Sequence, residues 1–175
     1  SRSSRETIET QVSVEVNLDG HGNYEVSTGN GMFNHLLAQL SRHSLIDLNI
    51  SAGGDIEVGW HHLVEDVGII LGRTIREAVG DGRSITRMGH SYVPLDEALV
   101  RTVVDFGGRG YAVIDAPLTD SDLGGLPADL IRHFLESLAR EGGFNLHVNV
   151  LAGSNNHHKA EAIFKSLARA LRAAL

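Results

Sequence analysis

This sequence of 175 residues lacks three features, and each absence excludes a class of structure or partner. Cysteine does not occur, which excludes both a disulfide framework and thiolate ligation of a metal. No apolar run approaches the roughly 18 residues of a membrane span, and residues 1–9 are polar, so we expect a cytoplasmic protein with no membrane partner and no secretory signal. Lysine and arginine form no cluster and the formal net charge is -7, which argues against a nucleic-acid partner.

These absences also limit what a binding site can contain. Any bound metal has to be held by nitrogen and oxygen atoms, and any anionic ligand by a few well-placed cations. Because 42% of the residues are hydrophobic, the chain can bury an adequate core either as one compact domain or as two fused half-domains.

The motif His-His-x-x-Glu occurs twice, at residues 61–65 and at residues 157–161. On a helix, positions i and i+4 lie on one face, so the first histidine of each motif and its glutamate can converge on one cation. The second histidine lies partly around the helix and can reach another cation. The motif therefore favours a site in which neighbouring cations are bridged.

An internal duplication extends beyond the two motifs. His35 and His133 each open a stretch with apolar residues and an arginine in the same register. The apolar residues that follow the motifs also match without a gap: Val67, Leu71, Ile75 and Ala78 in the first copy, and Ile163, Leu167, Leu171 and Ala174 in the second. The repeat is too long for a solenoid. We therefore interpret the chain as one compact fused domain with half-repeats over residues 1–83 and 84–175.

Alternation and periodicity of apolar residues predict the elements of each half. The first half is expected to contain strands over Glu9–Gly20 and Tyr24–Ser27, a helix over Met32–His43, a strand over Ile46–Ile50 that Gly53-Gly54 ends, and a helix over His61–Val79. The second is expected to contain strands over Leu95–Asp105 and Tyr111–Ile114, a loop over Leu123–Pro127, a helix over Ala128–Arg140, a strand over Asn145–Leu151, and a final helix capped within residues 153–156. The predicted fold class is α+β, a duplicated ββαβα unit whose two sheets carry helices packed on their inner faces.

The repeated histidines and glutamates are candidate metal ligands. A single histidine at a helix start is more often a cap or a solvated residue, and a duplication without a metal could also leave such residues behind. The two copies, however, agree best at histidine and glutamate, which favours metal binding. The imidazole-rich set suits two ions such as Mn, Fe, Co, Ni or Zn better than Mg or Ca. The candidates are His35, His61, His62, Glu65, His133, His157, His158 and Glu161.

At this point the chain resembles a known family along essentially its whole length. The matching stretches are residues 5–10 (RETIET), 18–22 (LDGHG), 27–29 (STG), 33–37 (FNHLL), 61–66 (HHLVED), 94–99 (PLDEAL), 108–109 (GR), 132–134 (RHF) and 156–158 (NHH), with Glu161, Phe164 and Lys165. These stretches are similar to those of the imidazoleglycerol-phosphate dehydratases of histidine biosynthesis.

The resemblance implies an activity, a cofactor and an assembly. The family removes water from imidazole-glycerol phosphate to give imidazole-acetol phosphate. In its proposed chemistry two Mn ions per active site grip the imidazole ring and help its electrons to expel the hydroxyl group. The eight candidate ligands match the family's ligands. The family builds each site between subunits of a 24-copy homo-oligomer made from trimers, with a small phosphorylated imidazole as substrate.

The resemblance also assigns roles on the substrate side of the site. Lys165 lies four residues after Glu161, on the same helix face, whereas the equivalent residue of the first half is Ile69. With Arg87 and Arg109, Lys165 matches the family positions that hold the phosphate. The remaining assignments are Glu9 as a substrate-contacting carboxylate, Glu161 as the base, and His43 with Asp96 as the pair that reprotonates the intermediate.

Four positions near the first histidine ligands depart from the family pattern, as do Gly107 and Gly110 around Arg109. Asn34 replaces an Asp before the first ligand, Gly59 and Trp60 replace Asp-Asp before the first doublet, and Leu63 replaces a Thr after it. Loss of carboxylates that support the ligands can weaken metal binding roughly 10- to 100-fold. Two alternatives therefore stay open beside the active dehydratase: a divergent paralogue with weak or altered activity, and a binuclear phosphoester hydrolase.

Overall fold

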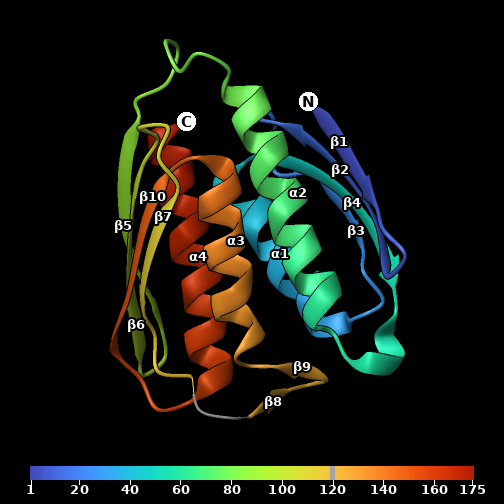
Figure 1. Cartoon of the computed structure of the whole chain (residues 1–175). Coiled ribbons are helices and arrows are strands. Elements are labelled where there is room, and N and C mark those ends of the chain that lie inside the picture. The colour runs from blue at the N-terminus through green and yellow to red at the C-terminus, as the bar shows by residue number, and fades with distance from the viewer. Residues whose placement is uncertain (119–120) are drawn as a thin grey trace.

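Two four-stranded sheets enclose a layer of four α-helices in the computed structural model, which describes residues 1–118 and 121–175 (Figure 1). The first half comprises β1 (Arg2–Glu6), β2 (Thr10–Asn17), β3 (Tyr24–Ser27), α1 (Gly31–Ser44), β4 (Asp47–Gly54), a short 3-10 helix η1 (Ile56–Val58) and α2 (His61–Val79). The second comprises β5 (Met88–Leu95), β6 (Ala98–Asp105), β7 (Tyr111–Asp115), β8 (Asp122–Leu123), β9 (Leu126–Pro127), α3 (Leu130–Gly142), β10 (Asn145–Ala152) and α4 (Asn156–Ala174).

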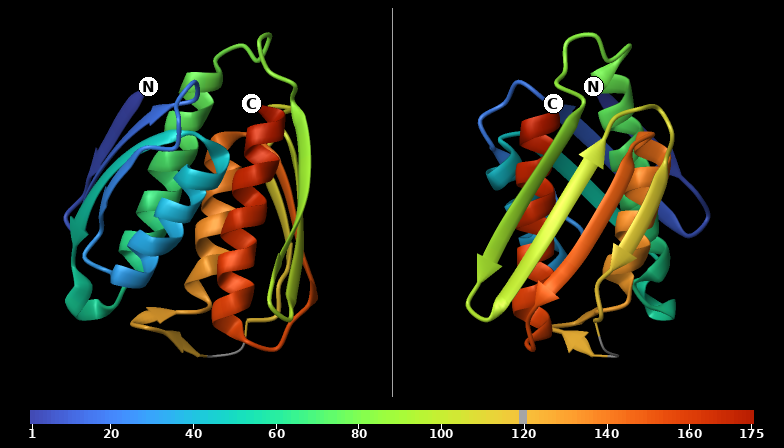
Figure 2. Two further views of the ribbon diagram at one scale, coloured as in Figure 1. Left: turned by 180° about the vertical axis from the view of Figure 1, so that it is seen from behind. Right: turned by 90° about the vertical axis from the view of Figure 1, so that its left-hand side faces the viewer.

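The two sheets have the same topology. Their strand orders are β1-β2-β4-β3 and β5-β6-β10-β7, and in each the last pair is parallel and the others antiparallel. Figure 2 shows the second sheet face on in its right-hand view. Alternate residues such as Val12, Val14 and Val16 of β2 are buried against the helices. The predicted α+β class, the duplication and the helices on the inner faces are therefore confirmed.

Each four-stranded sheet has one strand more than the sequence predicted. The predicted strand over Leu95–Asp105 is wrong at its start, because the chain turns at Asp96-Glu97 and Leu95 closes the preceding strand β5. Strands β1 and β5 were missed because neither has regular alternation: β1 has no apolar residue, and β5 contains Gly89 and Pro94. Both are edge strands, where a weak apolar pattern and proline are tolerated.

Two glycine-containing segments also differ from the prediction. Gly53-Gly54 does not end β4 but continues it, paired with Gln11 and Thr10. A Cβ on Gly54 would lie 2.7 Å from the carbonyl oxygen of Glu9, so a close approach of the two strands requires glycine there. The predicted loop over Leu123–Pro127 contains the small β8–β9 hairpin.

The helices pair across the two halves. Helix α1 of the first half packs on α4 of the second, and α2 packs on α3. Phe33 and Phe134 meet edge to face with ring centroids 5.5 Å apart, and Phe134 stacks on Phe164 at 5.4 Å. All three rings are buried, so helices from both halves build one continuous core. No described helix combines the length and apolarity needed to cross a lipid bilayer.

We expect Gly72→Ala to destabilise the fold through the α2–α3 crossing. A Cβ at Gly72 would lie 2.6 Å from the carbonyl oxygen of Leu138 and 2.8 Å from the amide nitrogen of Gly142, both backbone atoms that cannot move alone. Overpacking of this kind costs about 1 to 3 kcal/mol. Urea unfolding should show a lower midpoint, whereas Gly31→Ala, which would meet nothing within 4 Å at the start of α1, should leave the midpoint unchanged or slightly higher. Equal effects of the two substitutions would contradict this explanation.

Candidate active site at the helix N-termini

Both histidine doublets lie at the N-terminal ends of helices. The first opens α2, and the second lies in the first turn of α4. The Asn155 side chain accepts a hydrogen bond from the amide of His158 and so caps α4, as the sequence predicted. Helix α2 has no such cap, because its N-cap residue is Trp60. Because the two helices begin at these positions, one histidine of each doublet lies beside a helix of the other half: His61 beside α3 and His157 beside α1.

One group of candidate ligands, which we call the α1/α4 cluster, consists of His35, His157 and Glu161. His35 Nε2 lies 2.9 Å from Glu161 Oε1, and His157 Nε2 lies 2.8 Å from Glu161 Oε2. The two oxygens of the Glu161 carboxylate thus contact two different imidazoles. The Glu161 side chain is only 14% exposed, whereas both histidines are about half exposed. The cluster therefore opens to solvent on its imidazole side.

The charge of Glu161 depends on these partners. Burial would raise its pKa, but the hydrogen bond from His35 and the positive charge of Lys165 outweigh burial, and the pKa lies below its usual value. Glu161 is therefore a carboxylate near neutral pH. Lys165 Nζ lies 3.8 Å from Glu161 Oε1, one helical turn further along α4.

The second group, the α2/α3 cluster, consists of His61, Glu65 and His133. The rings of His61 and His133 lie 4.7 Å apart between centroids, and His61 Nε2 lies 3.6 Å from Glu65 Oε2. These residues occupy the repeat positions of the α1/α4 cluster. In both clusters, therefore, one half contributes the single histidine and the other half contributes the histidine and glutamate of its motif.

The second histidine of the first doublet faces the β1–β2 turn. His62 Nδ1 lies 3.4 Å from Glu9 Oε2, but the two atoms do not form a hydrogen bond. Among the described side chains, His62 Nδ1 is a buried nitrogen without a hydrogen-bond partner. Glu9 is about half exposed and is therefore available to another ligand.

The second histidine of the other doublet makes a tighter contact with Glu97, a residue to which the sequence assigned no functional role. His158 Nδ1 lies 2.5 Å from Glu97 Oε1, and His158 Nε2 lies 3.7 Å from Asp96. Strand register makes Glu97 the counterpart of Glu9, because β6 and β2 pair equivalently with β10 and β4. The repeat itself could have identified Glu97, had the turn at Asp96-Glu97 been recognised.

Two predicted proton-transfer residues are not brought together within the chain. His43 lies at the end of α1, where its Nε2 is 3.0 Å from Gln39 Oε1. Burial first, and then the charges of Lys165 and other nearby cations, lower the pKa of His43, which is therefore neutral at pH 7. Asp96 lies instead beside His158 in the first turn of α4, whereas Lys165 and Arg169, two of the cations that lower the pKa of His43, lie about two and three turns further along that helix.

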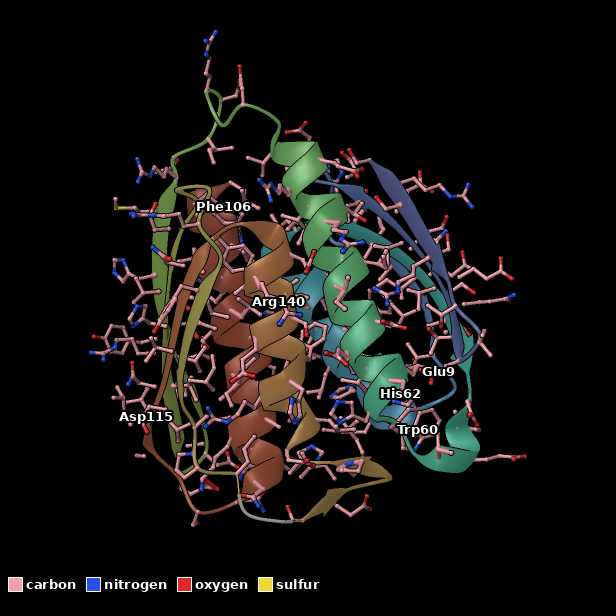
Figure 3. All side chains as sticks on the ribbon, in the orientation of Figure 1. Glu9, Trp60, His62, Phe106, Asp115 and Arg140 are labelled. Atoms are coloured by element: carbon pink, nitrogen blue, oxygen red, sulfur yellow. The ribbon has the colours of Figure 1, made fainter. Side chains whose placement is uncertain are left out.

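Arg87 and Arg109 lie at the other end of the helical layer from the histidines. The Arg87 amide bonds to the carbonyl of Ala174 at the end of α4, about 25 Å along the helix from His157. Arg109 belongs to the loop after Phe106, and Figure 3 shows Phe106 at the end of the molecule away from His62. The Arg87 guanidinium is held by Asp105, with Nε 2.7 Å from Oδ1. Within one chain, Lys165 is thus the only member of the predicted phosphate-binding trio beside the ligands.

The four departures near the first histidine ligands have different structural consequences. The Asn34 side-chain oxygen accepts hydrogen bonds from the amide and hydroxyl of Thr28, as a carboxylate would. Trp60 packs on the loop at Gly29 and lies with His62 and Glu9 at one end of α2 (Figure 3). Leu63 is buried, and Gly59 has a φ of 103°, which favours glycine. Of the four replacements, only Asn34 keeps hydrogen bonds that the aspartate of the family could also accept.

Within the described part of the chain, no three histidine, aspartate or glutamate side chains are arranged to hold a metal ion by themselves. Each cluster nevertheless offers two imidazoles and one carboxylate, a donor set that suits borderline transition-metal ions. His62 and His158, which point away from the clusters, could complete shells only with donors from elsewhere. The donor chemistry therefore fits a metal, and the geometry of one chain is incomplete.

Comparison with known proteins gives a consistent result. The family profile for imidazoleglycerol-phosphate dehydratase matches residues 28–171. The dehydratase of Dehalococcoides mccartyi strain 195 is 53% identical over 95% of this chain and 84% of its own, and that of Dinoroseobacter shibae is 53% identical over 98% and 88%. The crystal structure of the Staphylococcus aureus enzyme has a TM-score of 0.88 at 34% identity and covers 100% of this chain and 98% of its own. The Pyrococcus furiosus enzyme, solved with (S)-C348, has a TM-score of 0.86 at 35% identity and covers 98% of this chain and 92% of its own.

The fold and the similar sequences are thus those of an enzyme, a carbon–oxygen hydro-lyase. The chain belongs to the imidazoleglycerol-phosphate dehydratase family.

We expect Glu97→Gln to lower the pKa of His158 in protein stripped of metal by a chelator. The hydrogen bond that the His158 ring donates to Glu97 raises this pKa above its ordinary value of 6.5, with smaller contributions from the charges of Glu97 and Asp96. A raised folded-state pKa stabilises the fold fully below about 6.5, and this contribution is lost as the pH rises through the raised value. NMR titration of the His158 ring should show the decrease, and Asp96→Asn should cause a smaller one. An unchanged titration in Glu97→Gln would mean that the hydrogen bond does not form in solution.

Proposed function

We propose that this protein dehydrates imidazole-glycerol phosphate to imidazole-acetol phosphate in histidine biosynthesis, as a cytoplasmic homo-oligomer with two Mn ions per active site. Family membership supports the reaction. The observation that carries the rest of the proposal is the pair of equivalent clusters, each with two imidazoles and one carboxylate at helix N-termini.

The residues that would hold the metals follow from these clusters. His35, His157 and Glu161 would serve one ion, and His61, Glu65 and His133 the other. His62 and His158 would extend from each chain to ions held by a neighbouring copy. When bound, such ions withdraw electron density from the substrate imidazole and orient it.

In the proposed reaction one carbon of the glycerol chain loses a proton and its neighbour loses hydroxide. The resulting enol becomes the ketone by proton transfer, so one water molecule leaves in total. Glu161 would accept the first proton. It remains ionised because its pKa is lowered, and its basicity would rise if His35 turned away, since the His35 hydrogen bond is the largest of the influences that lower this pKa.

The proposed reprotonation uses His43 and Asp96. The pKa of His43 is lowered by burial and by neighbouring cations, so its imidazolium form would release a proton readily. Because Asp96 lies beside His158 and away from His43, we propose that the two act in one site only when different copies supply them.

The distribution of positive charge supports assembly. Lys165 lies beside the α1/α4 cluster, whereas Arg87 and Arg109 lie at the far end of the helices. Three cations can grip one phosphate only if different copies bring them together. We therefore propose that neighbouring subunits complete each site, in a trimer-based assembly of 24 copies.

The function is tested by incubating the purified oligomer with Mn and imidazole-glycerol phosphate and measuring imidazole-acetol phosphate and inorganic phosphate. We expect the ketone and no phosphate. Release of phosphate would identify a phosphoester hydrolase instead. Absence of both products from protein loaded with two metal ions per chain would favour a paralogue that has lost the activity.

We expect Lys165→Ile to impair turnover without loss of metal or fold. Isoleucine already occupies the equivalent position, Ile69, in the first half, and a charged hydrogen bond to phosphate contributes about 1.5 to 3 kcal/mol. The value of kcat/KM should therefore fall at least about 10-fold. Arg172→Ala, which removes an exposed cation from the same helix, serves as control and should have little effect. Loss of metal in Lys165→Ile, or full activity at low substrate concentration, would remove Lys165 from the phosphate site.

Removal of the metal should also reduce the size of the assembly. If subunits share ions through His62 and His158, chelation breaks contacts that no side chain replaces. Light scattering should then show smaller particles after treatment with a chelator, and the larger size should return with Mn. If a large assembly survives complete loss of metal, assembly does not depend on bound metal and the prediction is wrong.

A further inference from the structure

The first half contains a buried polar network that the second half lacks. Asp66, in the second turn of α2, accepts a hydrogen bond from the hydroxyl of Thr10, and Arg5 Nε lies 3.5 Å from the other carboxylate oxygen. The Asp66 side chain is only 11% exposed and Thr10 is buried. We call these three residues the Asp66 clamp.

The corresponding residues of the second half are all apolar. Strand register equates Arg5 with Val93 and Thr10 with Ala98, because the pairs Arg5–Val12 and Val93–Val100 occupy the same place in the two sheets. The gapless match of α2 with α4 equates Asp66 with Ala162. Val93, Ala98 and Ala162 are buried in the core. The fold therefore does not itself require a polar group at these positions.

The clamp is connected to the backbone of Glu9. The Thr7 hydroxyl oxygen accepts hydrogen bonds from the amides of Glu9 and Thr10, at 3.2 and 2.9 Å, and it lies 3.2 Å from the Thr10 hydroxyl. A chain of polar contacts thus runs from Asp66 through Thr10 and Thr7 to the amide of Glu9. Since His62 precedes Asp66 by one helical turn, both residues face this β1–β2 turn.

The two turns differ in what determines their shape. In the β5–β6 turn Asp96 adopts a φ of 48°, in the left-handed region that aspartate tolerates. Its counterpart in the β1–β2 turn is Ile8, which has no such φ: Leu45, Arg87 and Asp96 are the described non-glycine residues with positive φ. A β-branched residue is strongly disfavoured there. Ile8 is also fully exposed and packs on nothing that would hold it. The first turn therefore lacks this backbone conformation and is held by the Thr7 hydroxyl within it and, through Thr10, by Asp66 outside it.

We propose that Asp66 is a positioning residue that holds the β1–β2 turn on α2 and thereby directs Glu9 towards the substrate. The part concerning substrate rests on the proposed role of Glu9. Direct support comes from the contrast between the halves: Glu97, on the self-supporting turn, bonds closely to His158, whereas Glu9 stands 3.4 Å from His62 without a hydrogen bond. The clamp gives Glu9 a defined position while leaving its carboxylate half exposed and without a hydrogen bond to His62.

The first test measures amide hydrogen exchange in the intact oligomer. Asp66→Ala, which installs the residue that the second half has at this position, should accelerate exchange at Glu9 and Thr10 about 10-fold and leave the turn over residues 95–98 unchanged. Asp66→Asn retains an acceptor for Thr10 and should exchange nearly as the wild type does. Unchanged exchange in Asp66→Ala, equal acceleration in both turns, or equal acceleration by Ala and Asn would each overturn the clamp.

The second test asks whether the clamp acts through Glu9. Asp66→Ala should lower kcat/KM about 10-fold or more with metal content unchanged, because small displacements of a substrate contact are costly. In a Glu9→Gln background the same substitution should cost less than about 2-fold. An equal loss in both backgrounds would show that Asp66 does not act through Glu9. Full activity of Glu9→Gln alone would refute the proposed role of Glu9, and the exchange measurement would still decide whether the clamp holds the turn.

Discussion

The pairing of helices across the two halves is the constraint on which the rest of this structure depends. Because α1 packs on α4 and α2 on α3, neither half encloses its own core, and the rings of Phe33, Phe134 and Phe164 join both. The same pairing decides which ligands meet. Each motif supplies a histidine and a glutamate, and the helix from the other half supplies the remaining imidazole. The packing of the core and the geometry of the site therefore both follow from this pairing of helices across the halves.

Much of the fold could be predicted because its signals are local. The helix over His61–Val79 has the predicted bounds, and the alternation of Val12, Val14 and Val16 identifies a strand with one buried face. Edge strands β1 and β5 escaped prediction because their outer faces and free edges need no apolar pattern. Sequence periodicity reports burial, and a strand that is only partly buried gives a weak signal.

The residue types of the candidate site could be predicted from the sequence, but not which of these residues contact one another. The repeated residue types identified the donors, but the sequence could not tell that His35 meets Glu161 while His62 faces Glu9, since these contacts depend on how the helices cross. Glu97 was missed because a turn was read as part of a strand. Arg87 lies at the C-terminal end of α4, whereas Lys165 lies beside Glu161. This separation could not be predicted either, because the sequence does not show which end of a helix a loop reaches.

The pairing of helices across the two halves also has a consequence for how such a chain could arise. A single half, associated with an identical copy about the same axis, would form two identical clusters, each with its histidine from one copy and its motif from the other. An ancestral homodimer of this kind could not alter one cluster without altering its twin. A fused chain is free of that restriction, and its two halves differ where Lys165 stands opposite Ile69 and Asp66 opposite Ala162.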